Sequence, residues 1–427
     1  MKTKEKKPVK NIWKTQDEKQ HPESMIEWWC TMAFFQTQDK KRYSFKSTFT
    51  QWDEYGDIGS ILHSCLHDIN KKTKLPYYNR NEGKRLISKK NELYIKYDDS
   101  YLKGKYPNYK IFLHDKKNKI ELDIKYHAKI IPHWIAQDAT NGLLPIGIGY
   151  LRYGFIPLCD ITGSIKQENK LKKIQGQGYF EHVWGNFLYQ RPFSTLKEAK
   201  ITVNTYLKLV FWWLKEHKPK LHSSIKLSTD NNPFGYDWAW AVFDNGWSLF
   251  YANLLGFFMN GPGLGIIILT KDNKKYDEIG NFSVKYISTK KSKNFDFEYP
   301  TNFEISAKKG NENLYLNFKM SASPREYVSK FKKSKLWKGF AICEAPGEVK
   351  GYYDNGKEKL KLRGFCKIEP QRQISVFGHN SFEIKFNKSK KDFEINLDIE
   401  SNFFKKKVFT KIKFLQKPSI KFEMKRI

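Results

Sequence analysis

Residues 178–185, with the sequence GYFEHVWG, contain the alternation that decides the fold class. In a β-strand, alternate side chains share a face of the sheet. One face of this segment would carry Phe180, His182 and Trp184, and the other Tyr179, Glu181 and Val183. On either face an ionisable group is pressed into apolar bulk. The segment therefore predicts a strand on which Glu181 and His182 occupy opposite sides.

Most of the remaining chain repeats a strand pattern, in which aromatic and β-branched residues alternate with Lys, Asn and Asp. Clear examples are residues 93–97, 314–320 and 382–386. Two Asp-Asn-Gly triplets, at 244–246 and 354–356, are typical of tight hairpins between such runs. Many short strands at this spacing predict an all-β protein, either a sandwich or a barrel, and the length allows two similar β-domains in tandem.

Two segments differ from this pattern. In residues 196–217 the apolar side chains recur at helical spacing, which predicts a helix inserted into the β-rich scaffold. Residues 247–270 are apolar over a length that could span a bilayer. The turn residues 260–263 interrupt that stretch, and Asn253 and Asn260 would carry unpaired amides into hydrocarbon, so a buried hairpin is the better prediction.

Composition excludes several classes of protein. With 427 residues, 40% of them apolar, the chain is neither a disordered tail nor a disulfide-stapled peptide. The net charge of +32 comes from 68 Lys and only 9 Arg, whereas reading bases favours the planar guanidinium group. The excess is therefore interpreted as a Lys-rich solvated surface, and nucleic acid is not expected as a partner. Five well-separated cysteines without a CxxC pair, and a charged N-terminus without a secretory apolar segment, favour a reduced, cytoplasmic protein.

The candidate catalytic residues lie in three clusters of aromatic and acidic residues, at 27–29, 181–185 and 236–240. Burial among aromatic rings raises the pKa of a carboxyl group and keeps it protonated at neutral pH. Such an acid could protonate a carbon–carbon double bond, and Trp and Tyr faces could then stabilise the resulting carbocation. The structural alternative is that Glu181, His182 and Asp237 are core polar groups satisfied by neighbouring backbone.

Other catalytic or ligand sites are poorly supported. His63 and His67 could share a metal only if they lay on a helix, and no third ligand is identifiable. The Gly-rich residues 261–265 lack the Lys-Ser/Thr of a phosphate-binding loop, and no Gly-x-Ser-x-Gly elbow is present. We therefore expect neither a metal ion nor an organic cofactor.

Four short motifs resemble the carotenoid 1,2-hydratase (hydroxyneurosporene synthase) and AttH-like family. They lie at residues 27–29, 178–185, 238–246 and 344–351, so the resemblance runs from about residue 22 to residue 382. The family is built from two lipocalin-like β-barrel domains and hydrates or cyclises isoprenoid or polyketide-type substrates without metal or organic cofactor. The resemblance implies an N-terminal lipocalin-like domain over 22–185 and a C-terminal lipocalin-like domain over 235–427. The charged N-terminus predicts a flexible basic arm over residues 1–21, and the helix with its loop-like flanks predicts a helical insertion over 186–234 that departs from the family pattern.

The resemblance also implies roles for individual residues. The family signature Asp-His-Glu-Trp-Gly places its first carboxylate, histidine and tryptophan on Glu181, His182 and Trp184, while Val183 replaces its second carboxylate. The Tyr and Asp that the hydratases use downstream correspond to Tyr236 and Asp237, at a spacing that differs from the family's.

These observations combine into one expectation for the site. Glu181 or Asp237 is expected to donate a proton, and His182 to act as the base. The expected substrate-binding residues are Glu27, Trp29, Trp184, Tyr236, Trp238 and Trp240. The ligand would be a small hydrophobic molecule such as an isoprenoid, with a peripheral membrane contact through residues 196–217. The alternative function is a non-catalytic carrier of the same ligand, since a fold can be kept while its chemistry is lost.

Overall fold

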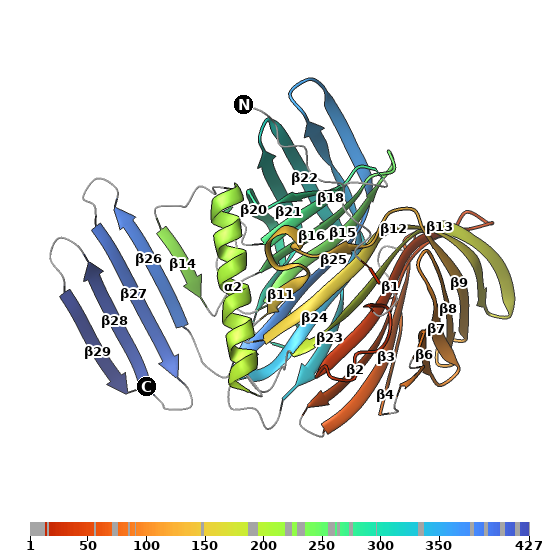
Figure 1. Cartoon of the computed structure of the whole chain (residues 1–427), viewed down its shortest axis with the longest axis horizontal. Helices are drawn as coiled ribbons and strands as arrows, with labels where there is room; N and C mark the ends of the chain where they lie inside the picture. Colours follow the sequence, from red (N-terminus) through yellow and green to blue (C-terminus); the bar gives the residue numbers. More distant parts are fainter. Residues whose placement is uncertain are drawn as a thin grey trace.

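The computed structural model describes most of the chain. The described residues are 13–14, 17–54, 57–70, 76–83, 86–89, 91–146, 149–186, 195–217, 224–228, 235–254, 261–262, 265–272, 276–295, 297–331, 337–375, 380–387, 392–401, 406–414 and 419–426. They are mostly β-structure arranged in three antiparallel sheets, which confirms the predicted all-β class (Figure 1).

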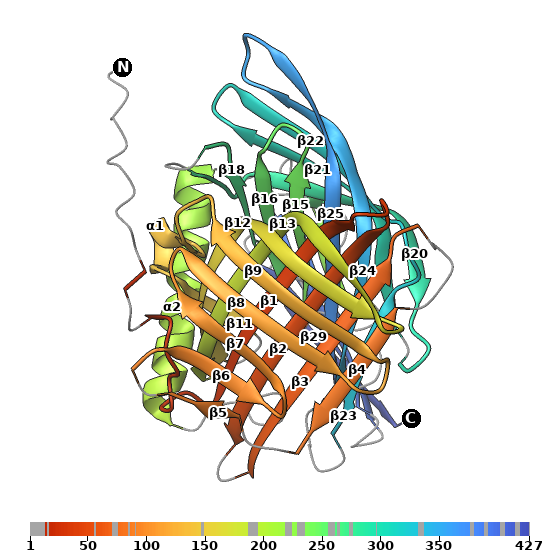
Figure 2. The same ribbon diagram turned by 90° about the vertical axis from the view of Figure 1, so that its right-hand side faces the viewer.

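The first sheet has 13 strands and curls into a half-barrel (Figure 2). Its central path runs through β4 (Tyr77–Glu82), β3 (Asp57–Asp68), β2 (Arg42–Glu54), β1 (Ile26–Thr37), β13 (Lys170–Asn186), β12 (Gly149–Gln167), β9 (Ile120–Ala128), β8 (Asn108–Asp115), β7 (Ser100–Lys105), β6 (Leu93–Tyr97) and β5 (Ile87–Ser88). Two short strands, β10 (His133–Trp134) and β11 (Leu143–Ile146), pair with β12.

The second sheet has 11 strands and repeats this arrangement. Its path runs through β17 (Gly261–Pro262), β20 (Phe282–Lys291), β21 (Glu298–Lys309), β22 (Glu312–Met320), β24 (Trp337–Asp354), β25 (Lys359–Ser375), β15 (Gly235–Phe243), β16 (Ser248–Leu254), β18 (Gly265–Thr270) and β19 (Tyr276–Ile279), with β23 (Arg325–Lys330) paired to β24. In both sheets the opening strand, β1 or β15, pairs with the final strand of a long hairpin, β12–β13 or β24–β25. The shared order fits the prediction of two similar β-units in tandem.

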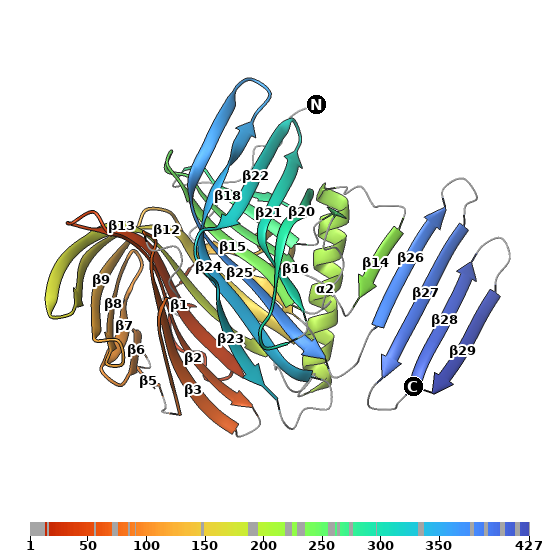
Figure 3. The ribbon, with the colours of Figure 1, turned by 180° about the vertical axis from the view of Figure 1, so that it is seen from behind.

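A third, five-stranded sheet lies apart from the other two and was not foreseen from the sequence. Its order is β14 (Ser224–Ser228), β26 (Asn380–Asn387), β27 (Asp392–Ser401), β28 (Lys406–Phe414) and β29 (Ser419–Arg426). Helix α2 (Leu196–His217) lies between this C-terminal sheet and the two large sheets, as Figure 3 shows from behind. The other helix of the described chain is the single turn α1 (Gln137–Thr140).

The apolar side chains form three main layers, because both large sheets are apolar on both faces. One layer fills the concave side of the first sheet and includes Trp29, Phe180 and Trp184. The second lies between the two large sheets and includes Tyr179 and Trp240. The third lies on the far side of the second sheet. A strand of either large sheet therefore delivers alternate side chains to two separate interiors.

The predicted helix and hairpins are confirmed. Helix α2 begins after Thr195, whose Oγ1 accepts a hydrogen bond from Glu198 N at 3.3 Å, as an N-cap residue does. Both Asp-Asn-Gly triplets connect paired strands, with Gly246 and Gly356 at φ of 84° and 82°, where a side chain would be strained. Residues 248–254 and 265–270 form the antiparallel pair β16–β18, as expected for a buried hairpin, although Asn260 and Gly263 lie outside the described residues. Within the described chain, no helix is long and apolar enough to cross a bilayer.

The N-terminal segment differs from the flexible basic arm expected over residues 1–21. Its described part packs against the first sheet: Trp13 is buried and its ring contacts Trp134 at 6.0 Å between centroids. Glu18 is also buried, and its Oε1 accepts hydrogen bonds from Tyr106 N at 2.9 Å and Tyr109 OH at 2.6 Å. Apolar burial and satisfied hydrogen bonds hold this end in place. Residues 1–12 lie outside the described part.

Candidate active site

A cavity of about 600 Å³ lies between the first and second sheets. Most of its wall is apolar and comes from both sheets, as illustrated by Trp28, Ile146, Trp238, Phe250 and Ile342. Among the polar groups in the wall are Lys46, Tyr153, Glu181, Tyr236 and Glu369. Its position between two packed β-units, with few polar groups among many apolar ones, is typical of a small-molecule site.

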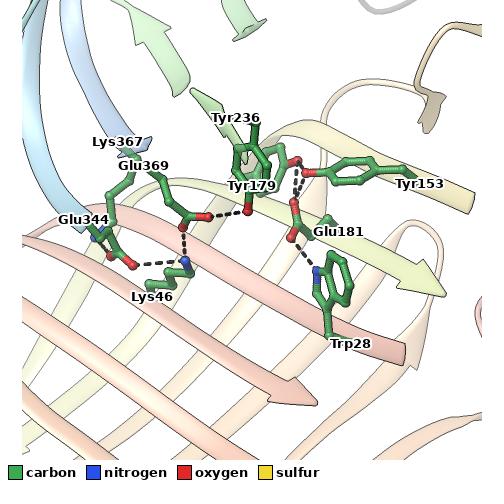
Figure 4. A network of polar contacts seen from close by, with 9 residues as sticks. All are labelled: Trp28, Lys46, Tyr153, Tyr179, Glu181, Tyr236, Glu344, Lys367 and Glu369. Carbon is green, nitrogen blue, oxygen red and sulfur yellow. Dashed lines mark hydrogen bonds and ion pairs between the residues drawn. The ribbon is translucent and has the colours of Figure 1, made fainter. Parts of the chain in front are cut away.

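Glu181 is a buried carboxyl group that the first sheet contributes to the cavity. Trp28 Nε1 donates to its Oε1 at 3.0 Å, and Tyr179 OH donates to its Oε2 at 2.8 Å. Tyr153 OH also donates to Oε2 and lies 3.0 Å from Tyr179 OH (Figure 4). Strand alternation brings Tyr179 and Glu181 to one face, because they are two residues apart on β13. Tyr153 and Trp28 come from the neighbouring strands β12 and β1.

The electrostatics of Glu181 favour the neutral acid. Its residue is 6% exposed, and burial raises the pKa of its carboxyl group although the three donors act in the opposite direction. The carboxyl group of Glu369 raises it further. A raised pKa increases the protonated fraction of the carboxyl group at a given pH, and the three donors can stabilise the carboxylate once that proton has left.

The second sheet contributes a chain of charges on the other side of the cavity. Tyr236 OH donates to Glu369 Oε1 at 3.1 Å, and Lys46 of the first sheet binds Glu369 Oε2. Lys46 Nζ also lies 3.0 Å from Glu344 Oε2, and Lys367 binds the other oxygen of Glu344 (Figure 4). Burial alone would raise the pKa of Glu344, but the adjacent charges of Lys367 and Lys46 outweigh it and hold that pKa well below its usual value.

The two buried carboxyl groups of the cavity wall occupy equivalent strands of the two sheets. Glu181 lies on β13 and Glu369 on β25, and each strand closes its long hairpin and pairs with the opening strand of its own sheet. Packing the sheets face to face therefore brings one carboxyl from each toward the same space. Glu181 is surrounded by neutral donors, whereas Glu369 is paired with a lysine.

His182 lies on the opposite face of β13 and does not line the cavity. Its Nδ1 donates to the carbonyl oxygen of Asp17 at 2.7 Å, and its Nε2 lies 2.9 Å from Glu27 Oε1. Burial lowers the pKa of His182 to about 3 and raises that of Glu27 to about 8, so the shared proton resides on Glu27 at neutral pH. The expectation that His182 acts beside Glu181 on one substrate is thus not supported by their placement, since adjacent residues of a strand point apart.

The remaining expected residues divide between cavity and core. Tyr236 and Trp238 line the cavity with Glu181. Trp29 and Trp184 pack around His182, with ring centroids 4.8 and 4.6 Å from the imidazole. Trp240 is buried between the sheets and donates its Nε1 to Pro157 O at 2.8 Å.

Asp237 faces away from the cavity, opposite Tyr236 on β15. Its Oδ1 lies 3.0 Å from Arg372 Nη1, and Tyr286 donates to its Oδ2. Arg372 and Asp237 are both buried, so the pair neutralises two charges inside the second sheet. This arrangement suits a structural ion pair rather than a proton donor.

One cluster of the described residues has donor atoms close enough to be considered for a metal. His21, Glu27 and His182 each place one donor atom within 4.8 Å of the others. Glu27 Oε1 and His182 Nε2 are only 2.9 Å apart, whereas two ligands of one tetrahedral zinc ion are about 3.3 Å apart. The geometry therefore fits a hydrogen-bonded pair. His63 and His67 lie on strand β3, not on a helix, so the i, i+4 ligand spacing does not apply to them.

Sequence reasoning assigned no role in the site to Trp28, Lys46, Tyr153 and Glu369 of the cavity wall, or to Tyr179, Glu344 and Lys367, which bond to them or to Glu181. Trp28, Tyr179 and Glu344 lie within the motifs at 27–29, 178–185 and 344–351, and a further signal was an acid or a lysine among small and apolar residues, as in 341–345 (AICEA) and 365–369 (FCKIE). Lys46 resembled the many solvated lysines of the chain, and only its pairing with Glu344 and Glu369 distinguishes it.

Comparison of the fold with solved structures identifies similar proteins. An AttH-like protein from Nitrosomonas europaea aligns with a TM-score of 0.55 and 15% identity, over 83% of this chain and 95% of that one. Kievitone hydratase from Nectria haematococca aligns with a TM-score of 0.54 and 11% identity, over 84% of this chain and 92% of that one. Neither a scan of protein-family models nor a comparison with curated proteins gives a match. The resemblance predicted from the sequence is thus confirmed at the level of architecture: the chain has the fold of the AttH-like and carotenoid 1,2-hydratase-like, lipocalin-like family.

Proposed function

We propose that the protein is a hydratase or cyclase that adds a proton to a double bond of an isoprenoid or similar lipid held between its two large sheets. The observation that carries this proposal is the buried carboxyl group of Glu181, which faces a cavity of about 600 Å³ opposite a second carboxyl group, Glu369. The likeness to a hydratase supports the proposal only through the shared fold.

Glu181 supplies the proton in this mechanism. The π electrons of the alkene form a new C–H bond with the carboxyl proton, which leaves a carbocation on the neighbouring carbon and a carboxylate on Glu181. Trp28, Tyr153 and Tyr179 stabilise that carboxylate by hydrogen bonding. The ring of Trp238 in the cavity wall can stabilise the cation.

Glu369 and Tyr236 form the base side of the proposed site. A water molecule attacks the cation to form the C–O bond, and its surplus proton passes to Glu369 directly or through Tyr236, which already donates to Glu369. Exchange with solvent restores the proton on Glu181. If a second double bond of the substrate reaches the cation before water does, a ring forms and a proton is lost to the same base.

The cavity favours a substrate that is mostly apolar with at least one polar group. Trp238 Nε1 is buried and has no hydrogen-bond partner among the described residues, so it can donate to a substrate oxygen. A lipid-soluble substrate also suggests a route from a bilayer. We propose the exposed apolar face of α2, which includes Val203, Leu207 and Phe211, as the membrane contact.

Isotope labelling tests the proposed chemistry. The purified protein is incubated with geranylgeraniol or squalene in H₂¹⁸O and, separately, in D₂O. Hydration is expected to yield a product with one ¹⁸O, and cyclisation an isomer with one deuterium at carbon. Recovery of bound but unchanged lipid across a panel of such substrates would contradict catalysis and support the alternative function of a lipid carrier.

A further inference from the structure

A row of side chains beside the cavity crosses five neighbouring strands of the first sheet. The register pairs Glu181 on β13 with Cys30 on β1, and Cys30 with Thr48 on β2. Thr48 is paired with His63 on β3, and His63 with Arg80 on β4 (Figure 2). Directly paired side chains share a face of the sheet, so the row faces the second sheet, and all of its members except Cys30 line the cavity. With strands about 4.8 Å apart, His63 lies roughly 14 Å from Glu181 along the row.

Three polar side chains meet in the part of the cavity that is remote from Glu181. Thr48 and His63 come from the first sheet, and Tyr327 comes from β23 of the second sheet. The ring centroids of His63 and Tyr327 are 5.1 Å apart, and all three side chains line the cavity. Thr48, His63 and Tyr327 are called the polar patch below.

The polar atoms of this patch are buried but poorly satisfied by the protein. His63 Nε2 has no hydrogen-bond partner among the described residues. Thr48 and Tyr327 are each 6% exposed, and their hydroxyl groups have no partner there beyond weak contacts with the thiols of Cys30 and Cys65. Buried polar atoms in proteins are normally hydrogen-bonded. Three such atoms in one part of a cavity therefore indicate a partner that comes from outside the chain.

The charge state of the patch restricts the group that it can bind. Burial lowers the pKa of His63 to about 3, and the positive charges of Lys46 and Arg80 act in the same direction, so the imidazole is neutral at neutral pH. Lys46 is paired with Glu369, and Arg80 with Glu82. Because these two cations already have partners, a ligand carboxylate would lose its hydration without gaining either of them. A hydroxyl group suits a neutral imidazole in either tautomer, since it both donates and accepts a hydrogen bond.

We propose that the polar patch binds the uncharged hydroxyl group of a long apolar alcohol, whose chain extends along the row toward Glu181. His63 Nε2 and the hydroxyl groups of Thr48 and Tyr327 are the hydrogen-bonding partners of that group. The inference rests on the proposed function in taking this cavity as the substrate site, and it adds the end group of the substrate. A buried water molecule is the alternative partner of the patch, and it would give no selectivity for an alcohol.

Saturated isoprenoids of one carbon skeleton test the end group without any chemistry. Phytanol, phytane and phytanic acid differ only at one end and contain no double bond that the protein could protonate. Each is supplied from methyl-β-cyclodextrin, and its dissociation constant is measured by displacement of the fluorescent probe N-phenyl-1-naphthylamine, whose own constant is determined for every variant. His63→Leu and Tyr327→Phe are each expected to weaken phytanol binding by about tenfold, with no loss of affinity for phytane.

His67→Leu is the matched control for His63→Leu. His67 lies on the same strand and burial also lowers its pKa to about 3, but it does not line the cavity, so both affinities should stay unchanged. Tyr327→Phe removes a single oxygen atom and keeps the ring, so it keeps the test decisive if circular dichroism shows that His63→Leu is unfolded. The proposal is overturned by unchanged phytanol binding in the folded variants, by equal losses for phytanol and phytane, or by a wild type that binds phytanic acid more tightly than phytanol.

The binding test and the isotope test can fail independently. A selective loss of phytanol binding, together with unchanged geranylgeraniol in the labelling experiment, would overturn catalysis and leave the polar patch as the alcohol site of a carrier. Labelled product from squalene, together with unchanged phytanol affinity in both variants, would overturn this inference and leave the proposed function intact.

Discussion

Glu181 and His182 are neighbours on strand β13. Each side chain is surrounded by buried hydrogen-bond partners, but the two lie in different environments. Glu181 faces the space between the sheets, where its carboxyl group accepts hydrogen bonds from Trp28, Tyr153 and Tyr179 and the residue lines the cavity. His182 faces the closed interior of the first sheet, where Glu27, Trp29 and Trp184 surround it. Burial shifts the pKa of Glu181 and of Glu27 in the same direction.

The difference shows that a shifted pKa alone does not identify a catalytic group. Glu27 has a raised pKa but does not line the cavity of about 600 Å³ between the sheets, whereas Glu181 has a raised pKa and does line it. A general acid must also reach its substrate within hydrogen-bond distance. Access, which strand alternation decides, is therefore what separates these two acids, and substitutions on the two faces should behave differently.

The largest expected effect is on catalysis after Glu181→Gln. Glutamine keeps the size of the side chain but cannot donate an acidic proton, so product formation should fall by about 10² to 10⁴-fold. Glu27→Gln, on the other face, should change the rate by no more than a few-fold. The measurement is ¹⁸O incorporation at saturating substrate. Equal losses in the two variants would show that the faces do not differ in function.

A second large effect is expected on the free energy of unfolding when the buried Asp237–Arg372 ion pair, which lies away from the cavity, is broken. Arg372→Leu leaves Asp237 buried without its guanidinium partner and should lower the free energy of unfolding by about 3 to 5 kcal/mol. Lys110→Leu is the control, because the Lys110–Asp123 pair is partly exposed and should contribute less than about 1 kcal/mol. Urea denaturation measures both. A cost below about 1 kcal/mol for Arg372→Leu would show that the pair is not structural.

Much of the fold could be predicted because it depends on local pattern. Alternation in residues 178–185 correctly separated Glu181 from His182, and helical spacing defined 196–217. The same alternation placed Asp237 opposite Tyr236. The alternation within a strand does not show which of its faces lines a cavity. The sequence therefore did not distinguish Glu181, which lines the cavity, from Asp237, which does not.

The rest of the site depends on contacts between distant parts of the chain. Lys46 and Glu369 are 323 residues apart, and only the packing of the two sheets brings them together. The C-terminal sheet was missed for a related reason, since β14 joins β26 after more than 150 intervening residues. Pairing of this kind is decided by tertiary structure and leaves no local signal.

A smaller effect is expected when one donor to Glu181 is removed. Tyr153→Phe deletes a hydrogen bond that stabilises the carboxylate, so the rate should fall by about tenfold, equivalent to about 1.4 kcal/mol. The pKa of Glu181 should rise further, and the alkaline limb of the pH–rate profile should move to higher pH. Tyr126→Phe is the control, because Tyr126 OH donates to Met32 O elsewhere in the first sheet. An unchanged profile in Tyr153→Phe would indicate that another group donates the proton.

A further effect is expected in the pH dependence of stability, and it tests the face of β13 that lies away from the cavity. In the folded chain the pKa of Glu27 is about 8, above its unfolded value of 4.5, so the folded state holds a proton that the unfolded state has released. The stability that this proton contributes is complete below about pH 4.5 and is lost as the pH rises toward 8, by up to about 1.4 kcal/mol per pH unit. Glu27→Gln cannot lose the proton, so its urea midpoint should fall less than that of the wild type between pH 5 and 8. Parallel curves would show that Glu27 is ionised in the fold, in which case its bond with His182 would require a protonated imidazole.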